Sequence, residues 1–476
     1  MRHFQKLCIA LFAFFAYNAN AQIQDLDLSD YKLPELKRQT LGFDFALSNR
    51  VDKSFYSTNY FEDFEEEIMN SAALNSRVIH TFYHNSPYWQ QDFYSSVNMA
   101  AGYRDAKEDK ALINETHRFN GGLSLYLVNR YYFQGNEGFF LGGTADVSYN
   151  YNYYKELNNR DKTNEVTIYL PLSIGYGRIE QVQDARQAAY IYDALQKQGK
   201  IDAVKSAEEL LEFARFISTI KNERFFDFRN KRIYELEELD RYLKENGYID
   251  EQDISYFATL SDLWSYGNTP IRNTGFRAEA FINPGYDLNE TLYRGEFDDL
   301  YNMRAYVLKT GLKATYEKPI NLYWQHYMNA DVYWGTEKSR IRLSNSYLGK
   351  YIYPGVYLDL NHGVGYYPNT RTSINAFYGL SMVKHFDKTD LDENTMGIKG
   401  QNITANLGFD LNYYISPQVR LSADLNVYYT VNNAKNEYVE VDYIASDQPY
   451  FNYQYPGYQK SRFNYALSAS LQYFLF

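Results

Sequence analysis

Histidines are the residues of this chain with the most varied chemistry, and there are seven of them. His80 and His84 stand four apart, a spacing that joins two imidazoles on a helix but separates them by about 13 Å along a strand. His326 and His362 fall in predicted strands that are neighbours, and both are expected to face outward near a tight turn. A lipid hydrolase would need a serine within hydrogen-bond reach of a histidine. We identify no such pair, so we expect no enzyme activity, no metal and no cofactor, and interpret both histidines as interfacial residues.

Carboxylates gather in two predicted loops, over 62–67 and 387–393. Oxygen ligands of this kind could hold Ca²⁺ or bridge to lipopolysaccharide through divalent ions. Neither run has the spacing of an EF-hand, so a solvated loop is the favoured interpretation. The net charge of −11 argues against a nucleic-acid partner, which requires a basic surface.

Strict alternation of apolar and polar residues dominates the rest of the chain. One example is Ile403, Ala405 and Leu407, interleaved with Thr404 and Asn406. A period of two predicts strands with one apolar and one polar face. The fourteen predicted strands lie near 40–50, 75–85, 91–105, 116–133, 138–154, 164–178, 272–284, 301–317, 321–335, 353–367, 371–386, 400–415, 418–431 and 459–476. Together with 51 tyrosines, which suit a membrane–water boundary, they predict an all-β transmembrane β-barrel of about 14 antiparallel strands.

Connection lengths support the barrel independently. Tight turns, such as Ser86-Pro87 and Ser416-Pro417, alternate with longer polar connections, such as 51–74 and 432–458. Barrels of the bacterial outer membrane have short periplasmic turns and longer outer loops. The alternation therefore predicts an even number of strands, with both termini in the periplasm.

The phase of each strand predicts which side chains line the lumen. Leu308 and Leu312 fall on the outward face of their strand, whereas the lysines beside them fall on the other face. A lysine or arginine facing lipid at the midplane would cost about 2–4 kcal/mol. The charged residues expected in the lumen are Arg277, Glu279, Lys309, Lys313, Arg420 and Asp424.

The N-terminus has the pattern of an export signal. Arg2 and Lys6 precede the apolar stretch 7–17, and Ala19-Asn20-Ala21 is typical of a cleavage site. The only cysteine, Cys8, falls within this segment, so we expect a mature chain without disulfides. The predicted organisation is a signal peptide over 1–21, a periplasmic lead-in over 22–38, six strands over 39–178, a helical insertion over 179–270 and eight strands over 271–476.

The insertion has a period of 3.6 residues instead of two. Candidate helices cover 183–198, 207–221, 230–246 and 251–264, and Ser206 with Glu209 fits a capping box. Four amphipathic helices can bury their apolar stripes on each other as an inserted α-subdomain. The insertion could form a periplasmic cap, a plug in the lumen or a docking surface for an envelope protein.

The junction with the insertion carries a cluster of charged residues. The segment Gly175-Tyr176-Gly177-Arg178-Ile179-Glu180 runs toward Asp184, and Arg224 and Arg229 follow later. This region resembles uncharacterised Bacteroidota outer-membrane β-barrel proteins with a helical periplasmic insertion. The resemblance implies a fold and a location but no catalytic residues. From their position, Arg178 and Glu180 are expected to hold the helices to the barrel wall.

The last strand resembles the assembly signal of outer-membrane barrels. Tyr473 belongs to its outward set, and the terminal Phe476 is out of phase with that set. We therefore expect the barrel assembly machinery as a partner, together with outer-membrane lipid and lipopolysaccharide. A periplasmic protein or lipoprotein could bind through 179–270.

Three functions fit these observations. The first is a porin-like or gated channel for small polar solutes, because barrels of sixteen strands hold water while those of eight are filled by side chains. The second is a structural barrel that recruits envelope partners through the insertion. The third is a hydrolase that acts on lipid.

Overall fold

The computed structural model describes most of the chain between residues 27 and 473. The exceptions are 58–63, 109–110, 136–137, 158, 202–205, 224–227, 250–251, 268–270, 296–297, 345, 353, 387–394, 417–418, 433–434 and 437–460. The proposed signal segment, the 387–393 carboxylate run, Arg224 and Phe476 lie outside the described residues.

Seventeen strands form one sheet. They are β1 Leu36–Ser57, β2 Phe64–Asn85, β3 Trp89–Glu108, β4 Ala111–Tyr132, β5 Phe139–Glu156, β6 Asn159–Tyr169, β7 Leu172–Gln181, β8 Asn273–Arg294, β9 Asp299–Pro319, β10 Trp324–Leu343, β11 Ser346–Ile352, β12 Gly355–Asn369, β13 Thr372–His385, β14 Thr395–Ser416, β15 Val419–Asn432, β16 Lys435–Asn436 and β17 Ser461–Tyr473.

These strands occupy fourteen positions across the sheet, because three positions are shared. Strands β6 and β7 both pair with β5 and β8, and the break between them falls at Pro171, which cannot donate to a ladder. Strands β11 and β12 share β10, and β16 continues the register of β15 along β14. The fold is thus the large β-barrel with fourteen strand positions that the alternation predicts.

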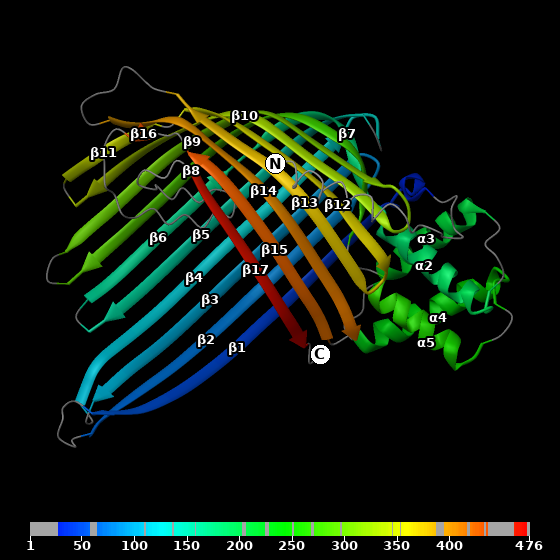
Figure 1. Ribbon diagram of the computed structural model, residues 1–476, viewed down its shortest axis with the longest axis horizontal. Helices are drawn as coiled ribbons and strands as arrows, with labels where there is room; N and C mark the ends of the chain where they lie inside the picture. Colours follow the sequence, from blue (N-terminus) through cyan, green and yellow to red (C-terminus); the bar gives the residue numbers. More distant parts are fainter. Residues whose placement is uncertain are drawn as a thin grey trace.

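The sheet curls along its length, which brings its first and last strands to the same side (Figure 1). The antiparallel ladder continues from β1 through every neighbour to β17. Among the described residues, no pairing joins β17 to β1. Apolar side chains on both of these margins are open to the surroundings, with Phe43 and Tyr465 each 71% exposed.

Several strands are longer than the alternation predicts, and the connections between them are correspondingly shorter. The predicted loop over 51–74 is mostly strand, because β1 ends at Ser57 and β2 begins at Phe64. The connection between β3 and β4 is also shorter than predicted, because β3 ends at Glu108 and β4 begins at Ala111. These extensions are rich in polar residues in the sequence, so alternation cannot reveal them. Part of the acidic run over 62–67 therefore lies in strand β2 and not in a loop.

Aromatic rings also cover glycines on the inner wall, a role that composition does not reveal. A Cβ added to Gly363 would lie 2.0 Å from the ring of Tyr327, and one added to Gly408 would lie 2.0 Å from that of Phe377. A glycine that leaves space for a ring on the next strand lets the ring lie flat against the sheet. The tyrosines therefore also build the wall.

Four α-helices interrupt the sheet between β7 and β8. They are α2 Gln183–Lys197, α3 Ala207–Lys221, α4 Phe228–Glu245 and α5 Ile254–Tyr266. Ser206 and Asp253 cap α3 and α5 by accepting the backbone N–H of Glu209 and of Tyr256. The helices share one apolar core with η1 (Leu28–Asp30), which includes Ile191, Phe213, Ile217, Leu239 and Leu260. No helix among the described residues is long and apolar enough to cross a membrane.

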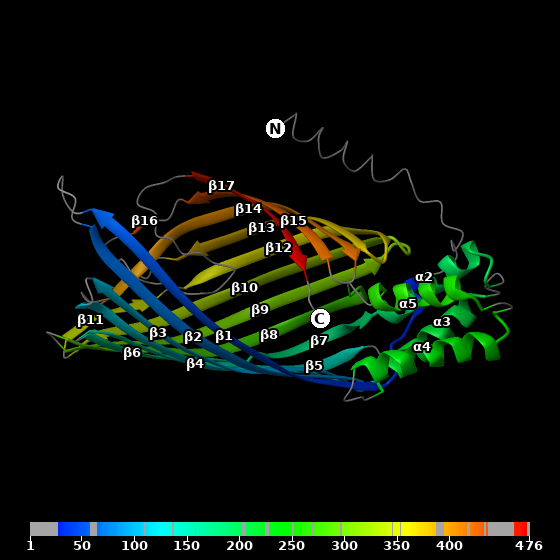
Figure 2. The ribbon, with the colours of Figure 1, turned by 90° about the horizontal axis from the view of Figure 1, so that it is seen from below.

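The helices lie beyond the strand ends, at one mouth of the barrel (Figures 1 and 2). We call this side the helical end. The turns that join β2 to β3, β9 to β10 and β12 to β13 also lie at the helical end (Figure 1). This placement favours a cap over a plug inside the lumen.

Candidate functional site

The candidate site is the mouth of the barrel where the helices meet the strands. Arg178, near the end of β7, is buried, and its Nε lies 2.6 Å from Oε1 of Glu180. Its Nη atoms donate to the carbonyls of Pro87 and Ser86 at 3.0 and 2.9 Å and to Asn85 Oδ1 at 2.7 Å. Arg178 therefore reaches past β4 and β5 to hold the β2–β3 turn. Hydrogen bonds to a charged donor are worth about 1.5–3 kcal/mol each, so this contact is a strong one.

Two glycines explain why Arg178 points into the mouth. Tyr176 faces outward, and strict alternation would place Arg178 outward as well. Gly177 has a φ of +91°, and Gly275 on the adjacent β8 has a φ of +122°. Residues other than glycine rarely adopt these backbone conformations. A Cβ on Gly177 would lie 2.2 Å from the carbonyl oxygen of Phe276. The glycine pair therefore changes the phase of both strands at the end of the barrel.

Arg272 holds a second turn and was not predicted from the sequence. It precedes β8, is 1% exposed and donates Nε to Gln325 Oε1 at 3.1 Å. Its Nη atoms donate to the carbonyls of the β9–β10 turn, at 2.5 Å for Leu322, 2.8 Å for Asn321 and 2.6 Å for Trp324. The only available signal was a basic residue at the start of the predicted strand. Most of its partners are backbone carbonyls, which carry no sequence signature.

Asp184 joins the first helix to the rest of the cap and to the barrel. Its Oδ1 lies 2.6 Å from Nζ of Lys221 on α3, and its Oδ2 lies 3.4 Å from Nη2 of Arg38 on β1. Arg38 also donates to Asn222 Oδ1 at 3.0 Å. The carboxylate and the ammonium are both buried, with side-chain exposures of 2% and 11%. Three elements thus meet at one carboxylate.

The Asp184 carboxylate makes the cap sensitive to acid. Burial alone would raise the pKa of Asp184, but the Lys221 ammonium and the Arg38 guanidinium outweigh burial and hold the pKa below its usual range. A depressed folded-state pKa stabilises the protein above the unfolded-state pKa of about 3.9, and this contribution is lost as the pH falls below that value. We expect helix α2 to lose protection from hydrogen exchange between about pH 4 and pH 2. Asp184→Asn should remove that dependence, and a wild-type profile in the variant would contradict it.

Further contacts attach the helices around the rest of the mouth. Tyr190 Oη on α2 donates to the carbonyl of Tyr367 on β12 at 2.7 Å. Arg371, in the β12–β13 turn, forms an ion pair with Asp262 on α5 and stacks 4.6 Å from the ring centre of Tyr266. Together with Arg38 and Asp184, these contacts fasten the cap to β1, β12 and the β12–β13 turn.

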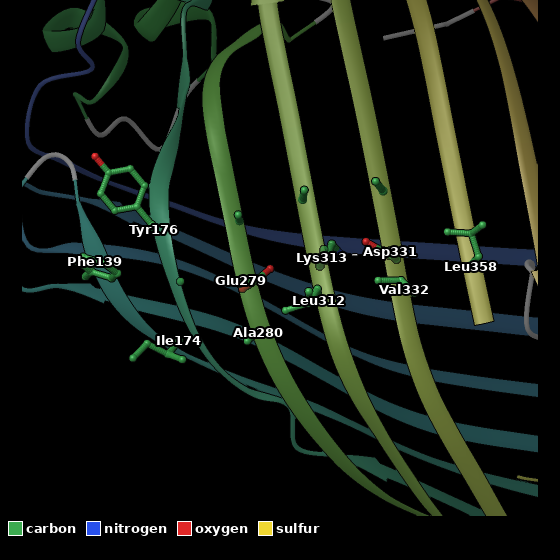
Figure 3. Close-up of a pocket in the computed structure, with 14 residues that line it drawn as sticks. Phe139, Ile174, Tyr176, Glu279, Ala280, Leu312, Lys313, Asp331, Val332 and Leu358 are labelled. Carbon is green, nitrogen blue, oxygen red and sulfur yellow. Dashed lines mark ion pairs between the residues drawn. The ribbon is translucent and has the colours of Figure 1, made fainter. Parts of the chain in front are cut away.

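The inner wall above the cap carries several of the predicted lumen residues. Arg277 and Glu279 on β8 lie 3.9 Å apart, and Glu279 accepts a hydrogen bond from Ser173 at 3.0 Å. Lys313 on β9 lies 4.0 Å from Asp331 on β10, an ion pair drawn in Figure 3. Lys309 lies 5.5 Å from the ring centre of Tyr169. These side chains form one polar wall over β7 to β10.

The remaining predicted residues lie elsewhere. Asp424 accepts from Ser468 at 3.0 Å, and Arg420 lies 5.9 Å from the ring centre of Tyr414, both on β15. Arg229 is exposed on α4, so the structure does not bring it to the Arg178 cluster. The backbone of Tyr473 pairs with Val419.

Comparisons with known proteins yield structural neighbours alone. No protein-family model and no curated protein sequence match this chain. The translocator domain of the autotransporter NalP from Neisseria meningitidis is similar with a TM-score of 0.29 and 6% identity, over 72% of this chain and 84% of that one. The alcaligin outer-membrane receptor FauA from Bordetella pertussis is similar with a TM-score of 0.32 and 8% identity, over 82% and 52%. The transport unit of the autotransporter AIDA-I from Escherichia coli is similar with a TM-score of 0.26 and 9% identity, over 77% and 88%.

Proposed function

We propose that this chain is a bacterial outer-membrane channel for small polar solutes, with the helices as a cap over its periplasmic mouth. The observation that carries the proposal is a polar, charged inner wall that ends at a mouth covered by helices. A Bacteroidota origin, both termini in the periplasm and insertion by the barrel assembly machinery belong to the same proposal.

The membrane location follows from the outward face of the strands. Leu312 on β9, Ile174 on β7 and Phe276 on β8 are all well exposed, and their neighbours in sequence that face inward are polar residues or glycines. A protein in water would not leave an apolar band of this size uncovered. Lipid covers such a band without cost, as it does in transmembrane barrels.

The width of the barrel and the chemistry of its wall support the proposed conducting role. Fourteen strand positions lie between the eight of barrels filled by side chains and the sixteen of water-filled porins. Lys313, Asp331, Arg277 and Glu279 project from the inner wall as paired charges. The Lys313–Asp331 pair is partly exposed and needs water around it, which favours a narrow aqueous path.

The cap is suited to regulate this path because part of its attachment is weak. Arg371 and Asp262 have side-chain exposures of 35% and 38%. A pair that is open to solvent contributes about 0.2–1 kcal/mol. The exposed Arg371 attachment can therefore open while the buried Tyr190 and Asp184 side chains keep the rest of the cap on the barrel.

Single-channel recording in a planar bilayer tests the proposal. Arg371→Ala removes one attachment of the cap, and we expect the open probability to rise by a factor between about 1.4 and about 5, which corresponds to about 0.2–1 kcal/mol. A bismaleimide cross-link between cysteines placed by Asp262→Cys and Arg371→Cys should lower conductance below that of the wild type. The predicted mature chain has no other cysteine to react.

Arg215→Ala is the matched control, because Arg215 forms an exposed ion pair with Glu208 within the cap itself, at 3.0 Å on α3. This variant should conduct like the wild type. A wild-type protein that inserts into the bilayer and passes no current, with or without the cross-link, would refute the channel.

One observation favours a second candidate, a scaffold that recruits an envelope partner. Ile254 at the start of α5 is 89% exposed, and Ile233 on α4 and Phe257 on α5 are half exposed. Apolar side chains of an amphipathic helix are normally buried against a neighbour. A silent bilayer recording, combined with a partner that copurifies with the wild type and is lost on Ile254→Asp, would support this candidate over the channel.

A further inference from the structure

Two histidines on the outward face of the barrel have no part in the channel. His326 on β10 and His362 on β12 contact each other, with Nδ1 of His326 3.4 Å from Nε2 of His362. Their ring centres are 5.4 Å apart, and the ring of Tyr378 on β13 lies 5.2 Å from that of His362. Polar groups that face lipid are costly, so a paired set of them requires an explanation.

A lysine extends this pair to a third strand. Lys318 on β9 is the register partner of His326 and is exposed. Closer to the helical end, the rings of Trp324 and Tyr366 contact each other at a tilt, with centres 4.4 Å apart. Paired aromatic rings of this kind mark the membrane–water boundary. The three basic side chains therefore stand next to that boundary, on the lipid side of the aromatic pair.

The same outward face is hollowed farther from the helical end. A groove of about 540 Å³ lies over β7 to β12 (Figure 3). Its lining includes Ala278, Ala314 and Ala330, which are register partners on β8, β9 and β10. Larger apolar residues border these alanines, among them Tyr176, Leu312, Val332 and Leu358. The groove is also lined by Glu279, Lys313 and Asp331, whose charged groups belong to the inner wall.

The groove and the basic residues are aligned along the strands. Ala314 is four residues from Lys318, and Ala330 is four residues from His326, which corresponds to about 13 Å of strand. Among the described outward positions of β9 from Tyr306 to Lys318, of β10 from Trp324 to Trp334 and of β12 from Val356 to Tyr366, none is a carboxylate. This face therefore offers cations at the boundary and an apolar depression below them.

We propose that this face binds one phospholipid, with its phosphate on Lys318, His326 and His362 and an acyl chain in the groove. The inference rests on the proposed membrane location. The ammonium of Lys318 and an imidazole N–H can each donate to a phosphate oxygen. A phospholipid has an anionic head followed by an apolar chain. This surface has three basic residues at the boundary followed by an apolar groove, in the same order.

A second copy of the chain is a poorer fit to the same surface. Two-fold packing would set the Lys318 and histidine cluster of one copy near that of the other. Like charges placed together in a medium of low dielectric constant repel strongly. A lipid phosphate neutralises the cluster instead.

Native mass spectrometry of the full-length protein in detergent tests the proposal with added phosphatidylglycerol. We expect one lipid per chain to survive transfer into the gas phase. Lys318→Gln combined with His326→Gln should weaken binding about ten- to hundredfold, the loss expected for hydrogen bonds to a charged group. Ala314→Phe, which fills the groove, should also reduce retention. Lys384→Gln and Ala145→Phe, which change outward residues away from this face, should bind as the wild type does.

The arms of the experiment separate the alternatives. Equal binding by all four variants would overturn the proposal, and so would a dimer that is lost on Ala314→Phe. Inorganic phosphate should fail to displace the lipid, because it leaves the groove empty; full displacement at matched concentration would overturn the role of the groove. A wild-type protein that inserts in membranes but retains no lipid would refute this inference alone. A protein that stays in the aqueous fraction without detergent would refute the proposed function itself.

Discussion

Asp184→Ala is expected to destabilise the helical cap by about 3–5 kcal/mol, the cost of removing one partner of a buried ion pair. Lys221 would keep its charge in a buried position but would lose the Asp184 oxygen that lies 2.6 Å from its Nζ in the wild type. Arg38 would lose the same acceptor, but it is partly exposed and can turn to solvent. The helical circular dichroism of the variant should melt at a lower temperature than that of the wild type, while the strand signal persists.

A surface pair on the same helix provides the control. Lys197 and Asp193 on α2 lie 2.7 Å apart at i and i+4, and the lysine side chain is 60% exposed. Asp193→Ala should cost no more than about 0.5 kcal/mol. Replacing both Asp184 and Lys221 with leucine should recover much of the loss, because no buried charge would remain. Equal melting temperatures for Asp184→Ala and Asp193→Ala would contradict the role assigned to Asp184.

Leu312→Arg is expected to have the next largest effect, about 2–4 kcal/mol against the folded barrel. Leu312 is 59% exposed on the outward face of β9. It is six residues, or about 20 Å of strand, from Lys318, which for a tilt of about 40° is a depth of about 15 Å. This is close to the midplane of an apolar band about 25 Å tall. Urea unfolding of the barrel in lipid vesicles measures the difference.

Asn329→Arg places the same side chain on the inner face of β10, where the residue is exposed. It should change stability by no more than about 0.5 kcal/mol, as at other solvated positions. The contrast between the two arginines tests which face meets lipid. An equal cost for both would show that the outward and inward faces have been assigned the wrong way round or that neither meets lipid.

The architecture could be predicted because it depends on periodicity. Alternation along residues such as Ile403, Ala405 and Leu407 reports a face that must be apolar all along a strand, so it survives without knowledge of any neighbour. The helices were equally visible, and the capping serine Ser206 marks the start of α3 where the structure places it. Strand ends were less visible, because strands outside the apolar band have no face that must be apolar.

The cap's attachment was only half predictable. Arg178, Glu180 and Asp184 were identified as charged residues at the junction, and all three are buried there. The partners of Arg178 in the β2–β3 turn were not identified, because Pro87 and Ser86 contribute backbone carbonyls, which every residue possesses. Arg272 was missed for the same reason.

The sequence by itself determined a barrel with an apolar outside, a polar inside and four inserted helices, because each follows from a local repeat of two or 3.6 residues. Only the tertiary structure decided that Gly177 and Gly275 turn Arg178 into the mouth, that Arg38 meets Asp184, and that His326, His362 and Lys318 share one patch. Those contacts join residues distant in the chain, and strand register and backbone conformation, rather than residue type, bring them together.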